Sequence, residues 1–369
     1  MNYSYWELKE WFTNIDFTIV GSGIVGLNCA LELQKKHPKA KILILEKGML
    51  PQGASTKNAG FACFGSLSEL IDDLNSHSEK EVYNLVEKRW KGLQLLRNNL
   101  GDKNIDFQQN KGFELCENEA FFEECISRKD EINQLLKPIF SADVFSIADN
   151  TFGFQKIHQK YIVNNFEGQI DTGKMAFELL QKVQKLGVKI LNNISVDSFT
   201  EVGNSVAIKT DKITFKTNKL FIATNGFAKQ LLEENVQPAR AQVIITKPIK
   251  NLHIKGTFHL DKGYYYFRNI NDRILFGGGR NLDFKTEETT EFGETEIIQK
   301  KKKKKLKETI LPNTSFEIEH KWSGIMGVGN QKKAIVKQVS NSVFCGIRLG
   351  GMGIAIGSLV GKELAELIK

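Results

Sequence analysis

Near the N-terminus, two short apolar runs flank an amphipathic segment. Residues 17–20 (FTIV) and 41–45 (KILIL) have the length and composition of buried strands. Between them, residues 27–37 (LNCALELQKKH) place apolar side chains on one face and end in polar residues, a pattern typical of a helix packed on a sheet. Together the three segments predict a β-α-β unit of about 30 residues.

The rest of the chain mixes both periodicities. The pattern predicts helices at residues 69–100, 119–136, 174–186 and 354–367, strands at 188–191 and 220–223, a hairpin over 206–215, and several strands between 240 and 280. We find no internal repeat and no long linker rich in Pro or Ser. We therefore expect an α/β fold whose domains are interwoven by chain crossings.

A glycine motif, GSGIVG at residues 21–26, directly follows the first predicted strand. Gly21 permits a tight turn, Gly23 lets the backbone approach a pyrophosphate, and Gly26 lets the helix pack closely on the strand. The helix N-terminus offers free N–H groups and a partial positive charge to phosphates. Glu46, 20 residues after Gly26, can accept hydrogen bonds from ribose hydroxyls. The spacing favours a dinucleotide site over the alternative, a glycine-rich turn without a ligand.

Two further glycine-rich segments bear on which dinucleotide is bound. Residues 53–60 (GASTKNAG) are small and polar, so their backbone can approach a large flat ligand. Residues 350–353 (GGMG) open the last predicted helix, whose N-terminus suits a ring oxygen that gains negative charge on reduction, such as a flavin carbonyl. We find no second glycine motif of β-α-β type, because residues 280–283, after the glycines at 277–279, do not begin a helical pattern.

Composition narrows the class of protein. The 369 residues suggest two or three domains, and the 25% charged fraction is ordinary for a globular protein. We find neither an apolar stretch of the roughly 18 residues that a membrane-spanning helix needs nor a signal-peptide pattern. The five cysteines form no CxxC pair and the six histidines are scattered, so we expect reduced thiols and no metal site. These features predict a soluble, cytoplasmic protein.

The net charge of +8 comes largely from residues 300–305, a run of six lysines. Outside the run, 45 basic residues face 43 acidic ones. A nucleic-acid footprint is expected to spread over a face and to interleave with aromatic residues. We therefore interpret the run as a solvated helix face, with a binding patch as the alternative, and do not expect nucleic acid as a partner.

The motifs, taken in order, resemble the FAD-dependent D-amino-acid oxidase and glycine/sarcosine oxidase superfamily. The quoted segments are DFTIVGSGIVG with LILEKG, GASTKNAG, IDTGKMAFELLQKVQKLGVKI, KLFIATNG, PARAQV, WSGIMG and RLGGMGIAIGSLVGKELAELI. The similarity spans nearly the whole chain. The TKNAG form and the SYWEL start look most like a bacterial branch of amino-acid dehydrogenases and polyamine-type amine oxidases.

The resemblance implies a Rossmann-like FAD-binding domain of glutathione-reductase type and a second α+β substrate domain built on an antiparallel sheet. The FAD domain would be discontinuous and take residues 1–80, 160–235 and 320–369, leaving 81–159 and 236–319 for the substrate domain. FAD would lie extended, with its adenine near Glu46 and Val196 and its isoalloxazine near Gly60 and Gly351. The expected cofactor-binding residues are Gly21, Ser22, Gly23, Ile24, Val25, Gly26, Glu46, Lys47, Gly53, Ala54, Ser55, Asn58, Ala59, Gly60, Val196, Ala223, Thr224, Gly226, Gly350, Gly351, Met352, Gly353 and Ile354.

The resemblance also implies a reaction. Members oxidise a C–N bond by hydride transfer to flavin N5, after which the imine hydrolyses, and the protein orients the reacting carbon. Because we find no nicotinamide motif, electrons would come from a small amine or amino acid and leave to oxygen or another acceptor. Two alternatives stay open: an FAD-dependent enzyme that modifies aminomethyl-uridine in tRNA, and a non-catalytic flavoprotein.

For substrate contacts, the strongest candidates are Tyr264 and Tyr266, which alternation places on one strand face. The alternative is that they belong to the sheet core. In glycine-oxidase-like members a tyrosine matching Tyr264 helps to bind the carboxylate, but Met326 stands where those members have an arginine. Arg348 is the candidate replacement, with a structural ion pair as its alternative. Arg240 resembles an arginine at the domain crossing and is interpreted as structural.

Covalent attachment of FAD, through Cys or His, occurs in some members of the family. Cys63 and Cys345 fall beside flavin segments, but neither has the matching context. A cysteine in such a position is most often a small buried thiol. We therefore expect non-covalent FAD.

Overall fold

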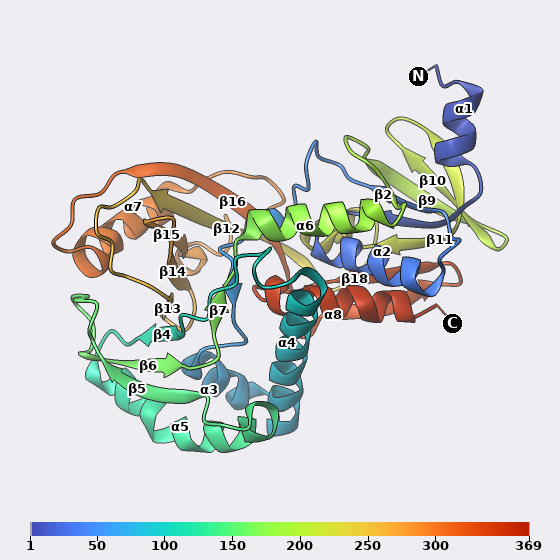
Figure 1. The fold of residues 1–369 in the computed structure, drawn as a ribbon. Coiled ribbons are helices and arrows are strands. Elements are labelled where there is room, and N and C mark those ends of the chain that lie inside the picture. Colours follow the sequence, from blue (N-terminus) through green and yellow to red (C-terminus); the bar gives the residue numbers. More distant parts are fainter. Residues whose placement is uncertain (1, 369) are drawn as a thin grey trace.

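Two eight-stranded sheets form the framework of the computed structural model, which describes residues 2–368 (Figure 1). Residues 1 and 369, the outer limits of the predicted FAD domain, lie outside this description. The first sheet has a parallel centre and follows the order β17 (Ile335–Ser340), β18 (Val343–Ile347), β11 (Thr214–Ile222), β1 (Ile15–Val20), β2 (Ile42–Leu45) and β8 (Lys189–Leu191), while β10 (Ser205–Thr210) joins β11 to β9 (Val196–Val202).

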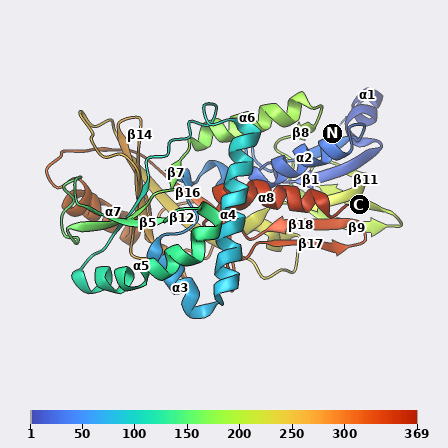
Figure 2. The same cartoon turned by 60° about the horizontal axis from the view of Figure 1, so that its bottom comes forward.

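Four helices share a core with one face of this sheet: α2 (Ile24–Lys36), α4 (Glu79–Leu100), α6 (Thr172–Lys185) and α8 (Gly353–Glu366). Figure 2 shows α4 crossing α8. The crossing is close because Gly92 has no side chain: a Cβ there would lie 2.2 Å from the carbonyl oxygen of Ala355. The last helix also packs closely on α2, since a Cβ on Gly361 would lie 2.7 Å from the carbonyl oxygen of Val25. Because α2 and α8 follow the parallel strands β1 and β18, both helix N-termini lie at the same edge of the sheet.

The second sheet is antiparallel except where β13 and β4 pair in parallel. Its order is β16 (Ile318–Val328), β12 (Gln237–Thr246), β15 (Arg273–Gly278), β14 (Tyr265–Ile270), β13 (Thr257–Leu260), β4 (Gly112–Leu115), β6 (Lys160–Asn164) and β5 (Phe145–Asp149). Helices α3 (Leu67–Ser76) and α5 (Glu119–Phe140) share a core with β5 and β6, whereas α7 (Glu296–Lys305) contacts β15. A short ladder of β3 (Phe61–Ala62) and β7 (Gly168–Gln169) and the short helix α1 (Tyr5–Glu7) complete these elements.

Stacked aromatic rings fill the core of the second sheet. Phe258 and Phe267 lie on paired strands with ring centroids 4.6 Å apart, and Phe113 stacks on Phe258 at 5.1 Å. Offset aromatic pairs on neighbouring strands add to the stability that burial of their area already gives. This core lies on the side of the sheet that holds α7 and leaves the opposite face to line a cavity.

The predicted fold class, a Rossmann-like α/β domain with a second antiparallel domain, is confirmed by this architecture. The region predicted as helical over 69–100 is two helices, because Ser66 and Ser78 each begin a capping box. Sheet membership differs from the predicted boundaries. Strands β6 and β16 belong to the second sheet although residues 160–164 and 320–328 were assigned to the FAD domain, and α4 packs on α8 although its residues were assigned to the substrate domain.

The lysine run forms most of α7 and is only partly the solvated face that the sequence predicts. Lys302 is fully buried and donates a hydrogen bond to the carbonyl oxygen of Gln242 at 2.9 Å. Its desolvation lowers the Lys302 pKa to about 7, although nearby Glu287 acts in the opposite direction. Lys300 pairs with Glu296 on the surface. Separately, no helix among residues 2–368 is long and apolar enough to cross a bilayer.

Candidate active site

The first β-α turn has the close packing that its glycines predict. Gly21 adopts a left-handed backbone (φ 103°), and a Cβ there would lie 2.9 Å from the carbonyl oxygen of Ala223, which directly follows the neighbouring strand β11. A Cβ on Gly26 would lie 2.0 Å from the carbonyl oxygen of Gly21. Any side chain at Gly26 would therefore push α2 away from β1, so Gly26 shapes the site by packing and does not line it.

The segment at residues 53–60 reaches across the start of α2. Ser55 Oγ accepts a hydrogen bond from the amide of Ile24 at 2.9 Å, which satisfies one of the free N–H groups of the helix N-terminus. A Cβ on Gly23 would lie 2.9 Å from the same hydroxyl. Gly23 thus leaves room for Ser55 in addition to its predicted role of letting the backbone approach a pyrophosphate.

Glu46 lies buried at the end of β2, where four donors hold its carboxylate. Its Oε2 accepts from the amide and the hydroxyl of Ser22, at 3.0 and 2.7 Å, and its Oε1 accepts from the amides of Gly48 and Gln52, at 3.0 and 3.5 Å. Ser22 was expected to contact the cofactor. The structure instead places it behind Glu46, where it orients the acidic residue.

A cavity of about 550 Å³ joins the two glycine-rich ends of the chain. Of the predicted cofactor residues, it is lined by Gly21, Gly23, Ile24, Val25, Glu46, Lys47, Gly53, Ala54, Ser55, Asn58, Ala59, Gly60, Val196, Ala223, Thr224, Gly350, Gly351, Met352, Gly353 and Ile354. Ser22, Gly26 and Gly226 do not line it. Gly226 is needed for packing, since a Cβ there would lie 2.5 Å from the carbonyl oxygen of Met326.

The residues around this cavity fit an extended dinucleotide. Added Cβ atoms on Gly53, Gly351 and Gly353 would meet no atom within 4 Å, so bare backbone faces open space at both the front and the rear segment. Thr224 lines the cavity, and its buried hydroxyl has no hydrogen-bond partner among the described residues. A buried polar atom without a partner is costly, and a ligand group would satisfy it.

The second sheet supplies the opposite wall. Tyr264 and Tyr266 line the cavity, while Tyr265, between them, is buried in the core on the other face, as strand alternation predicts. Burial raises the pKa of Tyr266 to about 12, so its hydroxyl keeps its proton at neutral pH. The ring of Tyr266 covers Gly277, where a Cβ would lie 2.2 Å from it.

A buried histidine–glutamate pair also borders this wall. His259 Nε2 lies 2.6 Å from Glu167 Oε1, which also accepts a hydrogen bond from Thr257 at 2.8 Å. Burial alone would lower the His259 pKa, but the charge and hydrogen bond of Glu167 outweigh it and raise the pKa to about 9. The imidazole is therefore positively charged at neutral pH, and it lines the cavity beside Phe61.

Arg348 does not reach the cavity. Its backbone is left-handed (φ 62°), and its guanidinium donates to the carbonyl oxygens of Lys333 and Asn235 at 2.9–3.0 Å. These contacts hold the segment before α8 against its neighbours. The predicted replacement of the missing arginine at Met326 is therefore not found at Arg348.

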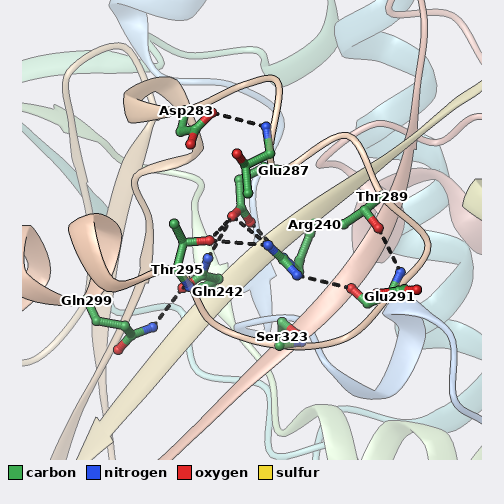
Figure 3. Close-up of polar contacts among 11 residues, drawn as sticks. Arg240, Gln242, Asp283, Glu287, Thr289, Glu291, Thr295, Gln299 and Ser323 are labelled. Carbon is green, nitrogen blue, oxygen red and sulfur yellow. Dashed lines mark hydrogen bonds and ion pairs between the residues drawn. The ribbon is translucent and has the colours of Figure 1, made fainter.

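Arg240 has the structural role that the sequence suggests (Figure 3). Its Nε and Nη2 each donate to one carboxylate oxygen of fully buried Glu287 at 2.9 Å. Burial would raise the Glu287 pKa, but hydrogen bonds from Arg240, Thr295 and Gln242 lower it overall. This network anchors residues 283–295, and that segment carries Thr290 and Phe292 to the cavity.

Sequence reasoning missed several side chains of the substrate wall. Arg280, Glu69, Lys332, Phe292 and His259 all line the cavity. Arg280 follows the glycines at 277–279, whose surrounding sequence does not fit a nucleotide motif. The end of a strand beside glycine-rich backbone was a usable signal, but no local pattern indicated which of these side chains face inward.

A family model described as FAD dependent oxidoreductase (DAO) matches residues 16–367. This chain belongs to that family. The probable oxidoreductase OrdL of Haemophilus influenzae is 21% identical, with 96% of this chain and 82% of the relative covered. Among solved structures, glycine oxidase from Bacillus cereus has a TM-score of 0.77 at 15% identity, covering 96% of this chain and 97% of that one. L-proline dehydrogenase from P. horikoshii has a TM-score of 0.76 at 18% identity, covering 96% and 93%.

Membership in the family makes FAD the cofactor of this chain. The resemblance drawn from the sequence motifs is confirmed. Because the structural neighbours are less than 25% identical to this chain, they establish its fold alone.

Proposed function

We propose that this flavoprotein oxidises a C–N bond of a small amine or amino acid. The observation that carries the proposal is the single cavity that runs from the N-terminus of α2 to that of α8 and continues along an aromatic wall of the second sheet. Glycine oxidase and L-proline dehydrogenase, two proteins with this fold, are named for amino acids. Bound FAD would supply the hydride acceptor.

The residues of the chain divide the work. The start of α2, Ser55 and Thr224 would hold the diphosphate end, and buried Glu46 would accept hydrogen bonds from the ribose. The N-terminus of α8 would stabilise negative charge on the reduced ring. Tyr264 and Tyr266 would position the substrate on the opposite wall and exclude water from it, with Tyr266 able to donate a hydrogen bond through its retained proton.

We further propose that FAD is held without a covalent bond and that the protein works in the cytoplasm. Cys63 lines the cavity with its Sγ 3.8 Å from Met352 Sδ, and burial raises its pKa, which keeps it a thiol and a poor nucleophile. Cys345 lies in the core of β18 and does not line the cavity. All five cysteines are free, which supports a reducing compartment. Oxygen or another carrier would take the electrons.

Anaerobic bleaching of the flavin tests the proposal. Purified protein loaded with FAD is mixed with a panel of amino acids, N-methyl amines and polyamines, and the loss of visible absorbance is followed. We expect at least one primary or secondary amine to bleach the flavin. Acid precipitation should release the yellow colour into the supernatant if attachment is non-covalent. A protein that cannot be loaded with FAD, or that no amine reduces, would end this reading.

A further inference from the structure

Arg280 is the arginine that lines the cavity in the described part of the chain, and its guanidinium has no acceptor there. It lies in a short helical turn (Arg280–Leu282) directly after β15, is half-buried, and lines the cavity. Its guanidinium carbon lies 4.7 Å from the ring centroid of Phe284. Among residues 2–368, none forms a hydrogen bond or ion pair with this group. An arginine that stacks on an aromatic ring keeps its N–H donors available for a ligand.

The other cations of the cavity have different situations. Lys332 pairs with Asp73 at 2.5 Å and Lys262 lies 3.5 Å from Asp72. His259 is bound to Glu167, so these three cations already have acidic partners. Lys57 lies over the ring of Phe292 and, among residues 2–368, has no ion pair, but it belongs to the segment 53–60 of the nucleotide wall.

Lys47 is likewise without an ion-pair partner in the described part of the chain, but it is solvent-exposed and follows Glu46 at the nucleotide end. Among the described residues, Arg280 is therefore the cation without an acidic partner that follows a strand of the second sheet into the cavity.

The surroundings of Arg280 identify the part of the cavity that it serves. The amide of Gly279 donates to the carbonyl oxygen of Tyr264 at 2.8 Å, and the rings of Tyr264 and Phe284 contact each other edge to face. Tyr264 and Phe284 are 40% and 45% exposed, which places this cluster at the rim. The wall formed by Gly324, Ile325 and Met326 supplies no positive charge.

We propose that Arg280 binds the carboxylate of the substrate at the rim of the cavity, so that the substrate is an amine carrying an acidic group away from the reacting carbon. Planar carboxylates match the fork of arginine donors. Acidic Glu287 and Glu288 lie near enough to attract Arg280, and a multiply charged anion would be repelled by them. A singly charged group fits better. This inference rests on the proposed amine oxidation for its account of the substrate.

Isothermal titration calorimetry on the FAD-loaded protein tests the inference without turnover. The probes are benzoate and its neutral relative benzyl alcohol, which differ chiefly in the carboxylate. We expect wild-type protein to bind benzoate at least tenfold more tightly than benzyl alcohol. Arg280→Gln should abolish this preference, and Arg280→Lys should keep part of it because a charge without the planar fork remains.

A matched control lies on the same strand-and-turn segment. Arg273 begins β15, and its guanidinium is paired with Glu319 outside the cavity, so Arg273→Gln removes an equal charge without touching the proposed site. This variant should keep the benzoate preference within about twofold. Flavin content and melting temperature confirm that each variant is folded, and if Arg280→Gln loses flavin, Arg280→Lys carries the comparison.

Each outcome bears on the inference. Loss of the preference in Arg280→Gln alone supports it. A wild-type protein without the preference, an undiminished preference in Arg280→Gln, or an equal loss in Arg273→Gln overturns it. Amine bleaching of the flavin is scored separately. Bleaching without a benzoate preference defeats only the role of Arg280, and a preference without bleaching by any amine defeats only the proposed oxidation.

Discussion

The two walls of the cavity are built on different principles. The nucleotide wall is made of backbone: glycines at the starts of α2 and α8 permit close approach, and one buried acid, Glu46, is fixed by local amides. The opposite wall is made of side chains that the second sheet brings together from distant segments. A ligand can approach the backbone closely only where glycines stand at a fixed spacing. Short sequence motifs therefore identify the nucleotide wall. The opposite wall depends on packing across the whole chain.

Gly26→Val should have the largest effect and tests whether the nucleotide wall depends on backbone packing. The first added carbon would lie 2.0 Å from the carbonyl oxygen of Gly21, so α2 would have to move. We expect the free energy of unfolding to fall by about 3 kcal/mol or more, with loss of flavin. Urea denaturation measures the change, and Gly53→Val, at an open position without a positive φ, serves as the stability control for loss of a glycine. Near-wild-type stability of Gly26→Val would contradict the packing role.

Arg240→Met tests the corresponding dependence of the substrate wall on buried charge. The substitution leaves Glu287 buried without its bidentate partner, which should lower the free energy of unfolding by roughly 3 kcal/mol. Residues 283–295 should become more sensitive to limited proteolysis. A variant with wild-type stability and the same cleavage pattern would show that the other contacts of Glu287 suffice.

Alkaline pH should weaken the substrate wall selectively. Because the His259 pKa is raised to about 9 in the folded protein, the pair with Glu167 stabilises fully below the ordinary histidine pKa and loses its contribution as pH rises through 9. We expect a loss on the order of 1–3 kcal/mol between pH 6 and 10. Denaturation curves across this range for wild type and His259→Gln measure it. An equally steep profile in the variant would assign the loss to other groups.

Gly351→Val separates ligand binding from folding. Its added Cβ meets no protein atom within 4 Å, so the apoprotein should keep its free energy of unfolding within about 0.5 kcal/mol. The side chain would enter the space assigned to the ring, and FAD affinity should drop at least tenfold. Fluorescence titration of the apoprotein with FAD gives the affinity, and normal binding would remove this segment from the site.

Tyr265→Phe should have the smallest effect and tests the alternation of the tyrosines. The buried Tyr265 hydroxyl has no hydrogen-bond partner among residues 2–368, so its removal should leave stability unchanged or raise it by up to about 1 kcal/mol. Flavin reduction by an amine should stay the same, whereas Tyr266→Phe, on the cavity face, should slow it. Stopped-flow absorbance compares the rates of flavin reduction in the two variants. Equal rates would contradict the prediction that only Tyr266 faces the substrate.

Much of the first wall could be predicted from the sequence, and little of the second. The spacing of the glycines and of Glu46 predicted that these residues lie at the nucleotide end of the cavity. This was possible because the backbone angles and close contacts of the first β-α turn depend on neighbouring residues in the sequence. Ser22 and Gly226 show the limit, since both lie within predicted segments but serve packing or orientation. Arg348 is the predicted replacement for the missing arginine, but its left-handed backbone and two carbonyl groups distant in sequence decide the direction of its side chain. The position of Arg280 in the cavity could not be predicted without knowing which strands are neighbours in the second sheet.

The segment 283–295 is anchored through Glu287, Thr295 and its backbone, whereas two of its side chains face the cavity. Arg240 bonds to Glu287, Thr295 and the carbonyl oxygen of Glu291 (Figure 3). Thr290 and Phe292 line the cavity. The side chains at positions 290 and 292 can therefore be exchanged, so that the cavity admits molecules of other sizes, while the hydrogen bonds that anchor the segment are kept. Altered substrate selectivity is therefore best sought by randomising positions 290 and 292 together.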